Sequence, residues 1–490
     1  MLAPMKSSSV VFAQSEKIKL LVIDLVMLVL VFWAVVRWRF EGQASYVIPW
    51  IELGAIAIIQ LVSLYIFGGY EIQLSAPARQ KWLRGLLSTG ATVLAVVLLN
   101  YFVGKEKAGL YGRGVLLGSL VGFYVVSNLY RHLAFSAFSK RSAVSRWLIL
   151  ASPHFLPGLK KDLDRQGLSS SVEFVVCDAE AQLSNSRNGG VGLNCSAVAG
   201  GGGRLGQQKF FEELTSQLQK TWAGIIVAVE KPGYLMPIGD EAGTTLIHFL
   251  MDLRFQGQTL HDLSEFYENL WRKVPVYYLA PEWFAMGEGF VIVSHPIRQR
   301  VKRLFDIGVS LTLLILTSPL LLIASLLIYL ESPGPVVYRQ IRTGKGGEDF
   351  TIFKLRSMIL NAEAPGKAQW AKERDSRILR CGQFLRKTRI DELPQLLNIL
   401  KGQMSFVGPR PERPEFNQDL EKQIPFYNMR HLIQPGLTGW AQVMYPYGAS
   451  VEDAQEKLQY DLYYIKNYSP LMDFQILLRT VRVVFLGSGR

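Results

Sequence analysis

Four apolar stretches of membrane-spanning length open the sequence, and they limit what the chain can fold into. They lie at roughly 18–36, 46–68, 83–103 and 114–131, with short polar segments between them. One stretch of about 20 apolar residues could be a buried core helix, but four in succession are typical of a membrane bundle. We therefore predict a bundle of four transmembrane helices over residues 1–143.

Lys and Arg flank these stretches unequally. Ten fall on the side of the N-terminus: Lys6, Lys17, Lys19, Arg79, Lys81, Arg84, Arg131, Lys140, Arg141 and Arg146. Five fall on the other side: Arg37, Arg39, Lys105, Lys107 and Arg113. Because positively charged loops stay in the cytoplasm, this asymmetry predicts a multi-pass protein whose N-terminus and residues after 131 are cytoplasmic. Asp24, inside the first stretch, is either a functional acid or a polar contact between helices.

The net charge of +13 indicates anionic partners. In a chain with membrane segments, it favours phospholipid head groups and nucleotides over nucleic acid. We expect inner-membrane lipid as a partner and no nucleic acid. The three cysteines have no metal-ligand spacing, so we expect neither a disulfide framework nor a zinc site.

Residues 144–296 read as an α/β domain. Four short β-rich runs alternate with helical stretches: 147–151, 172–176, 224–229 and 274–279. This alternation predicts a Rossmann-like domain with a parallel sheet. The turn at 151–158 lacks the glycines of a dinucleotide fingerprint and contains two prolines, which favours a role in structure, assembly or regulation over dinucleotide binding. The Gly-rich tract 189–206 is predicted to be a flexible insertion.

A further apolar run extends from Leu304 to Leu330 and contains Ser318 and Pro319. Proline removes a helical hydrogen bond and bends a helix, and a nearby serine can satisfy the freed backbone group. A full crossing would carry the Lys- and Arg-rich remainder of the chain through the membrane. We therefore favour a re-entrant helix that enters and leaves on the cytoplasmic face. A kinked spanning helix is the alternative.

Asp391 and Glu392 are adjacent acids that follow the basic residues Arg386, Lys387 and Arg389. Adjacent acids most often mark the start of a helix, where they complement its dipole. The functional alternative is a carboxylate that attacks phosphorus or holds Mg²⁺, with cations beside it to neutralise a phosphate. The residues by themselves leave both interpretations open.

Several rare motifs coincide in the C-terminal part. They lie at Ser332–Gln340, Phe353–Met358, Leu385–Gln395, Met404–Pro411 and Gln434–Gln442. In this order they resemble the motifs of the polyprenyl-phosphate sugar-1-phosphate transferases, the monotopic phosphoglycosyl transferase superfamily. The resemblance is close over about 300–485, and the N-terminal half resembles the larger members with four membrane helices. Tyr445–Ser450 and Tyr460–Lys466 are most similar to the exopolysaccharide-associated branch.

The resemblance implies a mostly α catalytic domain over 297–490, joined to the bacterial inner membrane by a re-entrant helix broken at Ser318 and Pro319. It implies transfer of a hexose-1-phosphate from a UDP-sugar to undecaprenyl phosphate, which initiates exopolysaccharide or related glycan synthesis. Asp391 would be the nucleophile, and Glu392 would act through Mg²⁺ or on the incoming polyprenyl phosphate. Both acids are candidate Mg²⁺ ligands.

The same resemblance implies a set of residues around the substrate phosphates. Those that clamp phosphate oxygens, or stiffen the loop that does so, are Lys354, Arg356, Arg386, Pro409, Arg410 and Pro411. Trp440 either stacks on uracil or anchors the domain at the membrane interface. Smaller relatives carry a Gly-Arg-Asn element where this chain has Met444–Ser450, so the identity of the sugar stays open.

Two other functions remain open from the sequence. One is a membrane-anchored NAD-dependent nucleotide-sugar dehydratase or epimerase, which the missing glycine fingerprint argues against. The other is an assembly scaffold in which residues 1–295 recruit downstream glycosyltransferases and export machinery. A homo-oligomer formed through the Rossmann-like domain is compatible with each of these functions.

Overall fold

The structure is a computed structural model of the chain. It describes residues 9–39, 50–70, 78–103, 113–144, 147–151, 155–165, 172–176, 224–228, 250–279, 281–360, 377–445, 448 and 450–485. The chain divides into two compact units, Met1–Leu270 and Trp271–Arg490. The Gly-rich tract 189–206 lies outside the described residues.

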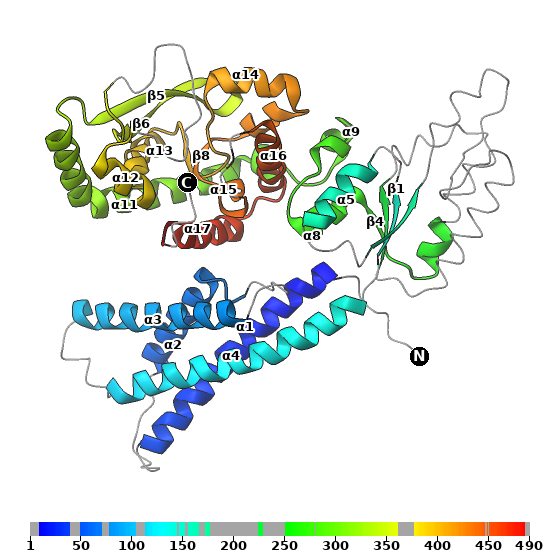
Figure 1. The fold of residues 1–490 in the computed structure, drawn as a ribbon, viewed down its shortest axis with the longest axis horizontal. Coiled ribbons are helices and arrows are strands. Elements are labelled where there is room, and N and C mark those ends of the chain that lie inside the picture. Colours follow the sequence, from blue (N-terminus) through cyan, green and yellow to red (C-terminus); the bar gives the residue numbers. More distant parts are fainter. Residues whose placement is uncertain are drawn as a thin grey trace. The chain divides into compact units, whose positions relative to one another are not determined.

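Helices form at each of the four apolar stretches that open the sequence (Figure 1). Their bounds are α1 Ser9–Arg39, α2 Trp50–Ile66, α3 Ala78–Val103 and α4 Arg113–Val144. Asp24 of α1 is fully buried and forms an ion pair with Arg131 of α4. It also accepts a hydrogen bond from Ser127 at 3.3 Å. Asp24 is therefore a polar contact between two helices.

Among the described residues, two helices are long and apolar enough to cross a membrane. They are the part of α1 from Lys17 to Arg39 and α11 Pro296–Glu331, which contain 18-residue windows with mean hydropathies of 2.6 and 2.5, respectively. Leu53–Ile66 and Trp82–Leu98 are shorter apolar helices. Together these helices indicate a membrane-associated protein, while a bundle that spans the membrane four times stays a prediction.

A four-stranded parallel sheet completes the first unit. The order is β2-β1-β3-β4, with β1 Trp147–Ala151, β2 Val172–Val176, β3 Gly224–Ala228 and β4 Leu260–Asp262. All of β1 is buried, as in parallel sheets that are covered on both faces. The helices α5 Leu156–Arg165 and α8 Leu263–Trp271 are joined by a hydrogen bond from Tyr267 to Asp162 at 2.8 Å. The parallel sheet is confirmed. Residues 177–223, between β2 and β3, lie outside the described residues, so the Rossmann-like assignment stays a prediction.

The second unit is mostly helical, as expected for the catalytic domain. After α11 its elements are β5 Val337–Thr343, η6 Lys345–Gly347, β6 Asp349–Leu355, α12 Arg380–Thr388, η7 Ile390–Gln395, α13 Leu396–Leu400, β7 Ser405–Val407, α14 Pro414–Gln423, η8 Tyr427–Leu432, β8 Gly436–Thr438, α15 Trp440–Met444, α16 Val451–Lys466 and α17 Pro470–Phe485. The strands form an antiparallel β5–β6 hairpin and a parallel β7–β8 pair.

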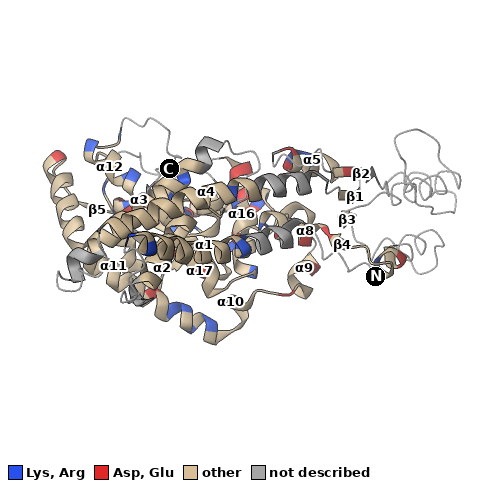
Figure 2. Cartoon of the chain, turned by 90° about the horizontal axis from the view of Figure 1, so that it is seen from below, with Lys and Arg blue, Asp and Glu red and all other residues tan. Residues whose placement is uncertain are grey.

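The long helix α11 carries basic residues in its first turns (Figure 2) and runs in two directions along its length (Figure 1). Pro319 lies inside it and has no N–H to donate to the carbonyl of Ile315. That carbonyl instead accepts a hydrogen bond from the Ser318 hydroxyl at 2.8 Å. The pair Ser318-Pro319 therefore releases one backbone bond and replaces it with a side-chain bond.

Both halves of α11 pack on the rest of the second unit. In the first half, Lys302 pairs with Asp473 at 2.7 Å, and Asp306 accepts from the backbone N–H of Phe406 at 3.0 Å. In the second half, the buried side chain of Ile328 belongs to an apolar cluster with Leu355, Leu379, Leu385 and Ile390. The helix is thus attached to the same unit on both sides of Pro319.

A segment ahead of α11 is also part of the second unit. It contains η5 Val276–Tyr278, α9 Pro281–Met286 and α10 Val291–Ser294. The strand expected at 274–279 is wrong: Pro275 cannot donate to a strand ladder, and Val274 donates to the carbonyl of Gln459 at 3.0 Å. Val276 is almost fully buried in the main core of the unit. The apolar run therefore reflects burial against α16 rather than a place in a sheet.

We predict that Val276→Ser lowers the free energy of unfolding of the second unit by about 2 to 4 kcal/mol, because it removes buried apolar surface and introduces a hydroxyl that lacks a partner. Tyr277→Ser is the matched control, since the Tyr277 side chain is half exposed. Thermal unfolding of the full chain in detergent measures both. Equal melting temperatures for the two variants would show that the segment does not belong to the folded core.

Candidate active site

The two acids follow a tight turn at the end of α12. Arg389 ends this helix in the left-handed region at φ 61°, an uncommon conformation for a residue with a side chain. Its carbonyl accepts from the N–H of Glu392 at 3.2 Å, which begins the short helix η7. The other end of α12 is held by Glu331, whose carboxylate accepts from the N–H groups of Arg380 at 2.6 Å and Cys381 at 2.9 Å. The end of α11 is thereby fixed to the helix that leads to the acids.

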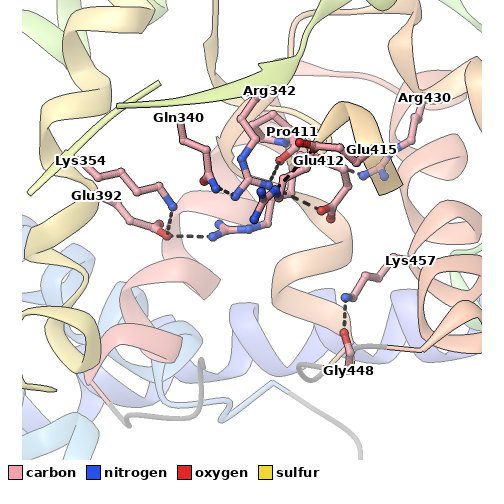
Figure 3. Close-up of polar contacts among 12 residues, drawn as sticks. Gln340, Arg342, Lys354, Glu392, Pro411, Glu412, Glu415, Arg430, Gly448 and Lys457 are labelled. Carbon is pink, nitrogen blue, oxygen red and sulfur yellow. Dashed lines mark hydrogen bonds and ion pairs between the residues drawn. The ribbon is translucent and has the colours of Figure 1, made fainter. Parts of the chain in front are cut away.

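Three cations surround the carboxylate of Glu392, and Figure 3 shows one of them, Lys354, directed toward it. The Oε1 of Glu392 is 2.8 Å from Nη2 of Arg410, 3.4 Å from Nη1 of Arg389 and 3.6 Å from Nζ of Lys354. Burial alone would raise the pKa of this carboxyl group. The attraction of Arg410, Lys354 and Arg389 outweighs that effect and holds the pKa well below its usual range. Glu392 is therefore ionised at neutral pH.

Asp391 is the opposite case. Its side chain is buried, and within the described residues its Oδ1 has no hydrogen-bond partner. Burial and the neighbouring charge of Glu392 raise the pKa of Asp391 to about 6. The two adjacent acids thus differ in role: one is bound by cations, and the other has an oxygen available for a ligand.

Lys354 and Arg410 reach Glu392 from different parts of the unit. Burial lowers the pKa of Lys354, on β6, to about 8. Arg410 lies in the loop 409–411, which follows β7. Just before this loop, the backbone at Gly408 lies very close to the backbone at the start of β8. A Cβ on Gly408 would lie 2.6 Å from the carbonyl oxygen of Gln434, and one on Gly436 would lie 2.1 Å from the nitrogen of Gly408. Side chains at these glycines would force the strands apart and move Arg410.

Two of the expected phosphate-binding residues lie outside this cluster. Arg356 donates to the carbonyl of Ser332 at the end of α11, and two of its buried nitrogens have no partner within the described residues. Arg386 is half-buried on α12 and contributes to the positive potential at Asp391. The structure therefore joins Lys354 and Arg410 to Glu392 but places Arg356 at the end of α11.

Sequence reasoning missed three arginines. Arg389 contacts Glu392 directly, Arg342 donates to the carbonyl of Pro411 at 3.2 Å, and Arg430 donates to the carbonyl of Arg410 at 3.0 Å. The presence of Arg389 beside the acids was a usable signal. The other two lie on distant segments and have no local signal.

Trp440 is not at the site surface. It is almost fully buried, and its indole N–H donates to the carbonyl of Arg272 at 3.0 Å. Both expected roles, stacking on uracil and anchoring at the interface, are therefore wrong. Apolar burial in the core explains this residue.

The side chains around the acid pair limit how a Mg²⁺ ion could bind. Within the described residues no three His, Cys, Asp or Glu side chains gather to bind a metal. Mg²⁺ is commonly held by one or two carboxylates together with substrate phosphates. The partnerless oxygen of Asp391 fits that arrangement, whereas the cations around Glu392 make it a poor ligand.

The family match to known proteins falls within the second unit. The family model described as bacterial sugar transferase matches residues 297–487. A UDP-N-acetylgalactosamine-undecaprenyl-phosphate N-acetylgalactosaminephosphotransferase of Aeromonas hydrophila is 47% identical over 40% of this chain and 47% of its own length. The match thus spans about half of that relative.

Two further relatives are covered more fully. A UDP-glucose:undecaprenyl-phosphate glucose-1-phosphate transferase of Caulobacter vibrioides is 46% identical over 37% of this chain and 68% of its own length. An exopolysaccharide production protein of Rhizobium leguminosarum is 43% identical over 37% of this chain and 93% of its own length. The acid pair, its cations and the loop at 409–411 all lie in the matched region, and the chain belongs to the bacterial sugar transferase family.

Proposed function

We propose that this protein transfers a hexose-1-phosphate from a UDP-sugar to undecaprenyl phosphate and so initiates exopolysaccharide or a related glycan. The observation that carries this proposal is the buried acid pair, in which Glu392 is bound by three cations and the Oδ1 of Asp391 has no hydrogen-bond partner among the described residues. The names of the relatives support the two substrate classes.

The first step uses Asp391 as a nucleophile. Its carboxylate oxygen attacks the β-phosphorus of the UDP-sugar, and the bond from that phosphorus to the bridging oxygen breaks. UMP leaves with the bonding electrons, and the sugar phosphate remains on Asp391. Lys354 and Arg410 stabilise the charge that spreads over the phosphoryl oxygens.

The second step returns the enzyme to its starting state. A phosphate oxygen of undecaprenyl phosphate attacks the same phosphorus, the bond to Asp391 breaks, and the carboxylate is regenerated. Two steps allow one site to accept a water-soluble donor and a lipid acceptor in turn. Glu392 holds Arg410, Lys354 and Arg389 around the phosphate in both steps.

Mg²⁺ belongs to the proposal as a cofactor that would bind the donor diphosphate. Asp391 is the favoured protein ligand, for the reason given above, and Glu392 is disfavoured. When bound, the ion would neutralise phosphate charge.

We also propose a multi-pass protein of the bacterial inner membrane, with four N-terminal spans and a cytoplasmic catalytic domain. A straight helix of 36 residues would be about 54 Å long, well beyond the roughly 30 Å of a bilayer core. The attachment of both halves of α11 to one unit supports a re-entrant helix over a spanning one.

Oligomers and contacts with downstream glycosyltransferases and export machinery remain part of the hypothesis. The relatives give no support to the NAD-dependent dehydratase or epimerase alternative.

We expect Asp391→Asn to reduce transfer of labelled sugar phosphate into the organic-extractable fraction by about 10,000-fold or more, because the amide cannot act as the nucleophile. The control is Asp419→Asn, since Asp419 is exposed on α14 and pairs only loosely with Lys422 at 3.9 Å. A rate near that of the wild type in Asp391→Asn would refute the nucleophile assignment.

The rate of UMP release should depend on pH as a bell-shaped curve. It falls below pH about 6, where Asp391 becomes protonated, and above pH about 8, where Lys354 loses its charge. Glu392→Gln removes a charge that raises the pKa of Asp391, so the acid limb should move to lower pH in that variant. Lys354→Arg should lose the alkaline limb, because arginine stays protonated. Unmoved limbs in both variants would contradict these assignments.

The membrane topology can be tested by labelling single cysteines with an impermeant thiol reagent. Ser294→Cys and Glu348→Cys lie at exposed positions on either side of α11, in a background without Cys177, Cys195 and Cys381. A re-entrant helix predicts that both react only in inverted vesicles. Lys107→Cys, on the predicted outer side, is the control that reacts only in right-side-out vesicles. Reaction of the first two from opposite sides would establish a spanning helix.

A further inference from the structure

Four consecutive carbonyl groups accept hydrogen bonds from elsewhere in the unit: those of the loop 409–411, which carries Arg410, and that of Glu412 directly after it. Pro409 accepts from the N–H of Gly436 at 2.8 Å, and Glu412 accepts from the N–H of Thr343 at 3.0 Å. Between them, the carbonyls of Arg410 and Pro411 accept from two arginine side chains. Pro409 and Pro411 have no N–H, so the loop depends on its carbonyls for attachment.

The first of these arginines is Arg342 on β5 (Figure 3). Its Nη1 donates to the Pro411 carbonyl at 3.2 Å, and its Nη2 donates to Oε1 of Gln340 at 2.7 Å. The guanidinium group also lies 3.8 Å from the carboxylate of Glu412. Arg342 is thus oriented by a neighbour on its own strand and by the residue that follows the loop.

The second is Arg430 in η8, which is buried. Its Nη2 donates to the carbonyl of Arg410 at 3.0 Å and to the Asp461 carboxylate at 2.9 Å. Its Nη1 donates to the Tyr427 hydroxyl at 2.5 Å. A buried guanidinium group with several fixed partners has little freedom to move.

We propose that Arg342 and Arg430 are positioning residues that hold the loop 409–411 by two adjacent carbonyls and thereby fix the side chain of Arg410 against Glu392. The two hold the loop from different segments, β5 and η8. A shift of about 1 Å in a catalytic group can reduce a rate about 100-fold. Neither arginine needs to touch the substrate for this effect.

The test follows the burst of UMP released from a labelled UDP-sugar in the absence of acceptor lipid, and so its readout rests on the proposed function. Burst amplitude counts folded, competent sites, and burst rate reports the chemical step. We expect Arg342→Met and Arg430→Met to keep the amplitude and to lower the rate about 10- to 100-fold. Arg342→Lys and Arg430→Lys should recover part of the rate, because an ammonium group can still donate a hydrogen bond to the loop carbonyl but lacks the several fixed donors of a guanidinium group. Arg339→Met is the control on the same strand, since Arg339 is exposed.

A double mutant separates positioning from other roles. If Arg342 acts through Arg410, then Arg342→Met in combination with Arg410→Met should be no slower than Arg410→Met alone. Multiplied losses would overturn the proposal and indicate direct contact with substrate. A loss of burst amplitude would overturn it in favour of a folding role. Wild-type protein without any burst would instead refute the covalent mechanism.

Discussion

The catalytic unit depends on one buried carboxylate and the cations that surround it. Glu392 brings together Lys354 from β6, Arg389 from the end of α12 and Arg410 from the loop after β7. A buried anion needs such partners, and a cluster of cations needs a buried anion to stay together in the absence of substrate. Within the described part of the chain, the Oδ1 of the neighbouring Asp391 has no hydrogen-bond partner, and burial together with the charge of Glu392 raises the pKa of Asp391.

This arrangement is linked to the membrane helix through backbone and side-chain contacts. Glu331 at the end of α11 caps α12, and α12 ends in the turn at Arg389 that leads to the acids. On the other side of Pro319, Lys302 binds Asp473 of α17. A helix held in this way fixes the position of the acids relative to the apolar surface of α11.

The sequence predicted the parts that depend on local patterns or on motifs. Apolar length predicted helices α1 to α4 and α11, and the motif order predicted that Lys354 and Arg410 would lie near the acids. It could not predict which donors and acceptors on distant segments form hydrogen bonds, such as the bond from Arg430 to the carbonyl of Arg410. It failed at 274–279 and at Trp440 for one reason: apolar residues that pack against α16 or the core look like a strand or an exposed aromatic contact.

The electrostatics explain why two adjacent acids do not compete for the same role. Two carboxylates of equal pKa would share the nearby cations, and neither would be free to bind phosphorus or metal. Here the backbone turn at Arg389 directs Glu392 toward the cations, while the buried Oδ1 of Asp391 has no hydrogen-bond partner among the described residues. The cations then remain in place for an incoming diphosphate, because Glu392 holds them before the donor binds. The geometry of one left-handed residue therefore separates an acid that is bound by cations from an acid with a raised pKa.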